Sequence, residues 1–336
     1  MHGSTGPRLG RGEGVSEPLV LALPSKGRLK EQAEAWLADC GLTVRSVGGA
    51  RGYAARIDGL DDVVVRFSSA ADIAASLAGG DAHLGVTGED LLREQGEPTE
   101  VGVLLLVPLG FGRADLVVAA PQSWIDVETM ADVDDVAHLY LARTGRRLRV
   151  ATKYTLQTRS FFARHGIADY RLAESGGATE GAPAAGAAEL VVDITTSGAT
   201  LAANFLKPLS DGVILRSQAH FAASLNAVWD PSRLAAARSL LRIVEARARG
   251  QSNLRLSWPP RQDALARGVA ATFGATDESG LLTARQSLFA AAEALAVAGV
   301  GPVSVVRPEY VFDAASPAYA ALEMAVGQTP PAKLGS

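Results

Sequence analysis

The chain has 336 residues, which at roughly 150 residues per domain predicts two or three domains. Its 32 lysines and arginines are outnumbered by 36 aspartates and glutamates, and the net charge of −4 excludes the strongly basic class of general nucleic-acid binders. Hydrophobic residues make up 48% of the chain, too many for a disordered protein, and a single cysteine, Cys40, excludes an internal disulfide.

We do not expect the N-terminal stretch to be a secretory signal. The first 17 residues contain no apolar segment of the secretory type, and no run of about 18 apolar residues occurs in the sequence. A single cysteine suits a reducing compartment. We therefore predict a cytoplasmic protein with no membrane and no nucleic-acid partner, and we expect residues 1–17 and 326–336 to be disordered tails.

The first ordered block alternates strands and helices. Residues 19–24 (LVLALP) are a short apolar run ended by proline, which predicts a buried strand, and an amphipathic helix follows up to Gly41. DDVVVRFSS, ADIAASLAGG and AHLGVTG then predict a strand, a helix and a strand. This order predicts a largely parallel α/β sheet over residues 18–108.

A second block of the same kind covers residues 109–204. ADLVVAAP and RLRVATKY predict strands, TLQTRSFFARHGI predicts a helix, and AELVVDITTSG passes from strand into loop. The strand-like sequence GVILRSQAHFAAS leads us to assign residues 205–228 to the first domain. Two α/β blocks joined by crossing strands imply two lobes and a cleft, with ligands beyond the carboxyl ends of the strands.

The pattern changes after Trp229. A long helix is predicted with Pro231 in its first turn and Gly250 past its end, and TARQSLFAAAEALAVAG predicts a second helix. Residues 302–312 look like a strand interrupted by Pro308. We expect residues 229–325 to form a smaller C-terminal module with a regulatory or oligomerisation role.

The most informative stretch is residues 174–206. An apolar strand ends in Asp193, and a loop of glycine and hydroxyl residues then opens a helix at Thr200 or Leu201. Small residues let backbone N–H groups approach an anion, and a helix N-terminus adds positive charge, so the loop predicts a phosphate site. The carboxylate of Asp193, just before this loop, is of the type that accepts hydrogen bonds from sugar hydroxyls or binds a magnesium ion. Taken alone, the loop is equally well explained as an ordinary strand-to-helix turn with a Ser or Thr cap.

Glu180, Gly186 and the segment VVDITTSGATL at residues 191–201 resemble the signature of the ATP phosphoribosyltransferase family, which catalyses the first step of histidine biosynthesis. Five further segments match the family: ALPSKGRL, LGVTGEDLL, LGFG, ATKY and DGVILRSQA. The resemblance implies two α/β lobes of the periplasmic-binding-protein type. It also implies transfer of 5-phosphoribosyl from phosphoribosyl pyrophosphate to N1 of ATP with release of pyrophosphate, with Mg²⁺ carried by the substrate rather than by a protein metal site.

The resemblance assigns roles to residues of both lobes. The 5-phosphate would lie against the loop residues Thr196, Ser197, Gly198, Ala199 and Thr200. Asp193 would hold the ribose hydroxyls, and Glu180 would lie near the sugar and the reacting centre. Lys26, assisted by Arg28, would meet pyrophosphate or triphosphate charge, although a solvated helix start explains this pair as well.

Four further residues are predicted nucleotide contacts. Asp90 and Leu91 follow a strand of the opposite lobe, and Arg51 and Tyr154 come from two other loops. Thr87 with Asp90 also fits a helix capping box, and solvated charge explains Arg51 equally well.

The family has a long form with a C-terminal regulatory domain and a short form that depends on a partner resembling a histidyl-tRNA synthetase. PSKGRLKEQ and ATEGAPAAG resemble the short form, yet residues 229–336 follow the catalytic part. We expect a homo-oligomer and leave open whether such a regulatory subunit is needed. The alternative function is a bilobal small-molecule-binding or regulatory protein without catalysis, since fold alone does not distinguish the two.

Overall fold

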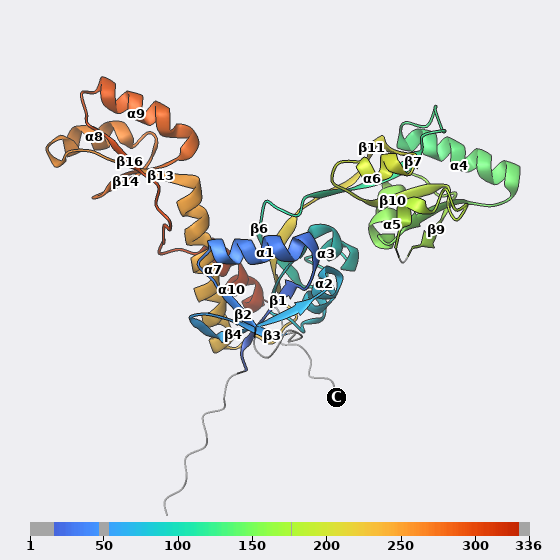
Figure 1. Cartoon of the computed structure of the whole chain (residues 1–336), viewed down its shortest axis with the longest axis horizontal. Helices are drawn as coiled ribbons and strands as arrows, with labels where there is room; N and C mark the ends of the chain where they lie inside the picture. Colours follow the sequence, from blue (N-terminus) through green and yellow to red (C-terminus); the bar gives the residue numbers. More distant parts are fainter. Residues whose placement is uncertain (1–16, 47–53, 176, 329–336) are drawn as a thin grey trace, which may run out of the picture.

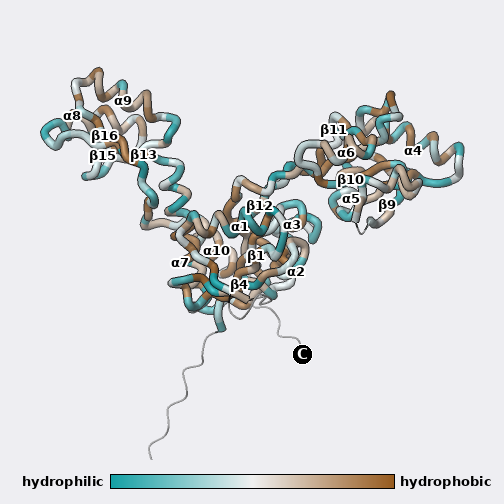
Figure 2. Tube along the Cα trace, viewed as in Figure 1, coloured by the Kyte–Doolittle hydropathy of each residue, from teal (hydrophilic) through white to brown (hydrophobic). Residues whose placement is uncertain are grey.

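The computed structural model describes residues 17–46, 54–175 and 177–328. These residues form three sheets, of seven, five and four strands, each in its own body. Figure 1 shows the seven-stranded body in the centre, with the five-stranded body and the four-stranded body on opposite sides of it. Apolar residues gather inside each body, whereas the end of the helix leading to the smallest one is largely hydrophilic (Figure 2).

The first lobe is built on the seven-stranded sheet. Its strands, in spatial order, are β2 (Val44–Ser46), β3 (Ala54–Ile57), β4 (Leu60–Ser68), β1 (Leu19–Pro24), β5 (Leu84–Gly88), β12 (Ala219–Ser224) and β6 (Val103–Pro108). Only β4, β1 and β5 run parallel, so the prediction of a largely parallel sheet is wrong and the sheet is mixed. Its first three helices are α1 (Gly27–Asp39), α2 (Ala70–Gly79) and α3 (Glu89–Gln95).

The second lobe is built on the five-stranded sheet. Its strands, in spatial order, are β11 (Leu206–Ser217), β7 (Ala114–Pro121), β10 (Leu190–Thr195), β8 (Leu148–Thr152) and β9 (Tyr170–Glu174). Its helices are α4 (Met130–Thr144), α5 (Thr155–Arg164), α6 (Ala199–Ala203) and the short 3₁₀ turn η1 (Thr179–Gly181).

The segment 205–228 does not return to the first lobe as a unit, which corrects our assignment. β11 pairs with β7 of the second sheet, and only β12 enters the first sheet, between β5 and β6. The chain crosses between lobes at Gln218, the residue between these strands. An uninterrupted strand-like sequence predicts extended backbone but not its pairing partner, because pairing is decided by residues far away in the chain.

The C-terminal region divides differently from the prediction. The helices α7 (Pro231–Ser252) and α10 (Pro317–Gln328) pack their apolar residues, including Leu240, Leu241 and Leu322, into the core of the first lobe. Gly250 lies inside α7 rather than beyond it, at a point where a side chain would clash with the carbonyl of Glu309. Residues 326–328 belong to α10 and not to a tail, whereas 1–16 and 329–336 lie outside the described residues.

The smallest body is a split βαβ unit. Its elements follow the order β13 (Asn253–Ser257), η2 (Pro260–Gln262), α8 (Asp263–Ala270), β14 (Gly274–Asp277), β15 (Gly280–Ala284), η3 (Arg285–Ser287), α9 (Leu288–Val297) and β16 (Ser304–Val306). The sheet order β14-β15-β13-β16 is that of a ferredoxin-like fold. Leu254, Leu256, Leu281 and Leu295 form its separate core. The strand predicted at 302–312 is reduced to the three residues of β16.

Candidate functional site

The loop between β10 and α6 lies open at the surface. Thr196, Ser197 and Thr200 are exposed, and Gly198 adopts a left-handed conformation with φ of 75°. The N–H of Gly198 donates to Oγ1 of Thr195 at 2.8 Å, which closes the turn. Ala199 is also exposed and begins α6, whose five residues make its dipole a weak one. The loop therefore presents mainly hydroxyls and backbone to a ligand.

A carboxylate beside this loop, that of Asp193, feels the charges of a second carboxylate and of an ammonium group. Asp193 lies half-buried on β10, and its Oδ1 accepts a hydrogen bond from the N–H of Ile194 at 2.8 Å. Burial raises the pKa of Asp193 above its usual value, the Glu180 carboxylate on η1 raises it further, and the Lys153 ammonium opposes both. The structure thus places Glu180 near enough to Asp193 to influence the charge of that carboxyl.

Lys153 is a candidate residue that the sequence analysis missed. Val192 of β10 pairs with Thr152 of β8 in parallel register, so the next residues, Asp193 and Lys153, follow at the same edge of the sheet. Lys153 is exposed, and its Nζ lies 5.0 Å from the ring centre of Tyr154. The signal that could have found it is its place in the segment ATKY, directly before the predicted contact residue Tyr154.

A cavity of about 500 Å³ separates the two lobes. Its walls come from loops after the carboxyl ends of several strands and from one crossing segment, and its residues include Arg28, Leu29, Asp90, Leu91, 110–114, Lys153, Tyr154, Ile194 and Thr196. Lys26, Glu180 and Asp193 do not line it. Lys26 is the exposed residue that precedes α1, two positions before Arg28. The cleft predicted between the lobes is therefore present, and five of the predicted residues reach it.

Asp90 and Tyr154 are buried at the bottom of this cleft. The Tyr154 hydroxyl donates to Oδ2 of Asp90 at 2.7 Å, and Oγ of Ser217 donates to Oδ1 at 2.8 Å. Tyr154 is 1% exposed and its ring packs in the second core, while burial and the Asp90 charge raise its pKa. The capping-box interpretation is wrong, because the Thr87 hydroxyl donates to the carbonyl of Ala70 instead.

Arg51 lies outside the described residues, so its predicted role has no structural description. Leu91 is half-buried and packs against core residues of both lobes. Within 17–46, 54–175 and 177–328 there is no group of three or more histidine, cysteine, aspartate or glutamate residues that could hold a metal ion. No helix in that part of the chain is both long and apolar enough to cross a membrane.

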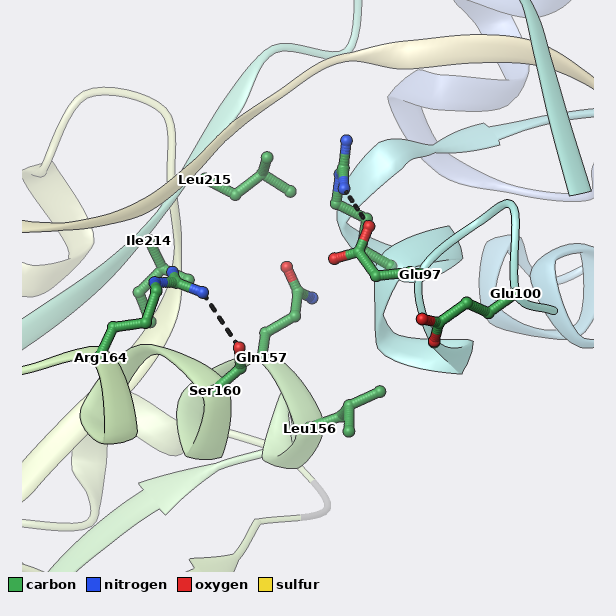
Figure 3. A pocket seen from close by; sticks show the side chains of 10 residues that line it. Glu97, Glu100, Leu156, Gln157, Ser160, Arg164, Ile214 and Leu215 are labelled. Carbon is green, nitrogen blue, oxygen red and sulfur yellow. Dashed lines mark hydrogen bonds and ion pairs between the residues drawn. The ribbon is translucent and has the colours of Figure 1, made fainter. Parts of the chain in front are cut away.

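A second cavity of about 300 Å³ lies at the junction of the lobes and was not predicted. Figure 3 shows Glu97 and Glu100 on one side of it, and Leu156, Gln157, Ser160 and Arg164 from α5 on the other. Arg164 donates to Oγ of Ser160 at 3.0 Å, and Arg93 pairs with Glu97 at 3.0 Å.

Residues 69–245 match the family model described as ATP phosphoribosyltransferase. The chain belongs to the ATP phosphoribosyltransferase family. It is 63% identical over 306 residues to the ATP phosphoribosyltransferase of Caulobacter vibrioides NA1000, covering 90% of this chain and 96% of the relative. The enzyme of the same name from Rhodopseudomonas palustris BisA53 is 51% identical over 320 residues, covering 92% and 98%.

A solved structure supports the architecture of an ATP phosphoribosyltransferase. The ATP phosphoribosyl transferase (HisG:HisZ) complex from Thermotoga maritima matches with a TM-score of 0.52 and 26% identity, covering 68% of this chain and 96% of that chain. The curated relatives align over more residues than the two lobes contain, so they share part of the C-terminal region.

Family membership establishes the reaction. The protein is a pentosyltransferase that joins the 5-phosphoribosyl group of phosphoribosyl pyrophosphate to ATP in histidine biosynthesis, and its reaction needs a divalent metal ion. The bilobal α/β fold is as predicted. The alternative of a binding protein without catalysis is not favoured, and the size of the chain is consistent with a long form of the enzyme.

Proposed function

We propose that the phosphoribosyl group binds at the carboxyl edge of the second sheet, facing the interlobe cleft. The observation that carries this proposal is that Glu180 and Lys153 lie near enough to Asp193 to shift its pKa, beside the open loop at 196–200. The loop, with Thr196, Ser197, Gly198, Ala199 and Thr200, would hold the 5-phosphate through backbone N–H groups and hydroxyls. Asp193 would accept hydrogen bonds from the ribose hydroxyls.

The chemistry follows from this placement. N1 of adenine attacks the anomeric carbon with inversion as the bond to pyrophosphate breaks, and the electron pair of that bond leaves on the pyrophosphate. Positive charge develops on the sugar, so the carboxylates of Asp193 and Glu180 stabilise the transition state. Lys153, with Arg28 and Lys26 from the opposite lobe, would stabilise the charge growing on pyrophosphate.

We propose Mg²⁺ as the divalent ion, carried in by the pyrophosphate or triphosphate of the substrates. The carboxylate oxygens of Asp193 and Glu180 are hard donors of the type that Mg²⁺ accepts, which supports this choice. Arg51, Asp90, Leu91 and Tyr154 remain proposals for the nucleotide side of the cleft. For Asp90 and Tyr154 the mutual hydrogen bond suggests a different role, developed below.

The organisation of the chain also remains a proposal. We propose that the two larger bodies form the catalytic unit and that the split βαβ module acts in regulation or oligomerisation, supported by its separate core. A homo-oligomer in the cytoplasm, acting in biosynthesis as its relatives do, is our expectation. The HisG:HisZ complex of the similar Thermotoga maritima enzyme supports our proposal of a regulatory partner resembling a histidyl-tRNA synthetase.

A direct assay tests the site. Purified protein is mixed with Mg²⁺, ATP and phosphoribosyl pyrophosphate, with pyrophosphatase to draw the reaction forward, and product is followed by ultraviolet absorbance. We expect Asp193→Ala to lower kcat/KM about 100-fold or more. Asp126→Ala, which removes an exposed carboxylate from a turn of the same lobe, should leave it unchanged. Full activity of Asp193→Ala would contradict the proposed role.

A further inference from the structure

The chain crosses between the two lobes twice, at residues 109–113 and at Gln218. Further contacts between the lobes surround these two crossings. Where the chain crosses, the N–H of Gly110 donates to Oε1 of Gln218 at 3.1 Å, and the N–H of Glu89 donates to the carbonyl of Gln218 at 3.0 Å. Beside this crossing, α3 of the first lobe meets the start of α5 of the second lobe, on the same side as the cavity of Figure 3.

The start of α5 is capped by the other lobe. Its own N-cap residue, Tyr154, makes no side-chain capping bond. Instead, Oε1 of Glu94 on α3 accepts from the N–H of Leu156 at 2.8 Å, and Oε2 accepts from the N–H of Gln157 at 3.2 Å. The first N–H groups of a helix lack partners within it and carry partial positive charge, so a carboxylate is favourable there.

A second set of bonds joins the same two helices. Asp90, one turn before Glu94, is 7% exposed, and its carboxylate accepts from the hydroxyls of Tyr154 and Ser217. The side-chain amide of Gln157 donates to the carbonyl of Asp90 at 2.8 Å. Since these donors belong to the second lobe and the acceptor to the first, the bonds couple the two bodies.

Apolar packing reinforces this coupling. Leu91, between Asp90 and Glu94, contacts core residues of both lobes. A rotation of one lobe against the other would separate Leu91 from one core and break the bonds of Asp90 and Glu94 together. The junction of α3 and α5 therefore opposes any change in lobe orientation.

We propose that Glu94 and Asp90 are positioning residues that fix the orientation of the second lobe and thereby the width of the catalytic cleft. Arg28 lies on one wall of that cleft, and Lys153 and Thr196 lie on the other. A transfer between two substrates bound across a cleft depends on this width, because a displacement of about 1 Å can cost about 100-fold in rate. The kinetic consequence rests on the substrate placement proposed above, whereas the coupling itself does not.

The test compares Glu94→Ala with Glu97→Ala in the full-length protein. Glu97 follows α3 and pairs with Arg93 of the same lobe, so it is a matched carboxylate outside the coupling. We expect Glu94→Ala to increase the radius of gyration measured by small-angle X-ray scattering without substrates. Its kcat should fall about 10- to 100-fold with smaller changes in the KM values, because each wall of the cleft stays intact. Glu94→Gln, which keeps one acceptor oxygen, should recover part of kcat.

Three outcomes would overturn the proposal. The first is wild-type scattering and wild-type kcat in Glu94→Ala. The second is wild-type scattering together with a loss of kcat, where kcat returns to the wild-type value once the assay is cooled well below the melting temperature of the variant. Such a result indicates that the substitution only lowers the stability of the protein. The third is an increase in the radius of gyration and a fall in kcat in Glu97→Ala that equal those in Glu94→Ala. The scattering experiment contains no substrate, so its result does not depend on where the substrates bind. A fully active Asp193→Ala would contradict the proposed substrate site, but the scattering of Glu94→Ala would still test the coupling of the lobes.

Discussion

Replacing Tyr154 with phenylalanine removes one hydroxyl from the lobe junction and keeps the ring in its core. The hydroxyl donates to the ionisable carboxylate of Asp90 at 2.7 Å, and Asp90 is 7% exposed. A hydrogen bond to a charged group contributes about 1.5–3 kcal/mol to the stability of the folded protein. This stabilisation is lost when a buried acceptor loses its donor. We therefore expect Tyr154→Phe to lower the free energy of unfolding by about 1.5–3 kcal/mol.

Differential scanning calorimetry of the ligand-free protein measures this effect. At about 4–8 °C per kcal/mol for a unit of about 100 residues, the size of the second lobe, its transition should move down by about 6–24 °C. Tyr319→Phe is the control, because its hydroxyl donates at 3.0 Å to Glu323, whose side chain is 56% exposed. A surface pair of this kind contributes less than about 1 kcal/mol. If both variants melt within about 1 °C of each other, the reasoning about the buried Asp90 carboxylate is refuted.

Three further predictions concern protonation. Lys153 lowers the pKa of Asp193 and Glu180 raises it. The acid limb of the pH profile of kcat/KM should therefore move to higher pH in Lys153→Met and to lower pH in Glu180→Gln. A profile that stays in place in both variants would contradict the influence of these two residues on Asp193. Burial lowers the pKa of His83 below its usual 6.5, so as the pH falls the unfolded chain binds the proton before the folded chain does. The free energy of unfolding, measured in urea, should therefore decrease as the pH is lowered from 6.5, by at most about 1.4 kcal/mol per pH unit. His83→Gln should flatten that dependence, and an equal slope in both proteins would count against it. Burial raises the pKa of Cys40 to about 12, so iodoacetamide at pH 8 should label it only after unfolding; rapid labelling of the native protein would show the thiol to be accessible.

Much of the local structure could be predicted because it depends on neighbouring residues. The apolar run at 19–24 forms β1, the helix of residues 155–164 is α5, and Cys40, the residue directly after α1, is buried. The loop after Asp193 lies between a strand and a short helix, as its small residues predict. These features follow from hydrophobic period, helix stops and turn residues, which act over a few positions.

Contacts between distant residues could not be predicted in this way. The capping box of Thr87 and Asp90 was plausible from spacing, but each side chain found a partner elsewhere, at Ala70, and at Tyr154 and Ser217. The helix that begins at Thr155 has no local cap, and nothing near it in the sequence points to Glu94.

The sequence by itself determined the family, the reaction, the bilobal α/β plan and the residues Asp193, Glu180 and 196–200 as candidates. Only the tertiary structure decided that β11 belongs to the second sheet, that α7 and α10 cover the first lobe, and that Lys153 lies near enough to Asp193 to lower the pKa of that carboxyl. The physical reason is the range of the interactions. Element type follows from residues a few positions apart, whereas strand pairing, helix packing and the hydrogen bonds that join the lobes depend on which surfaces meet after the chain has folded.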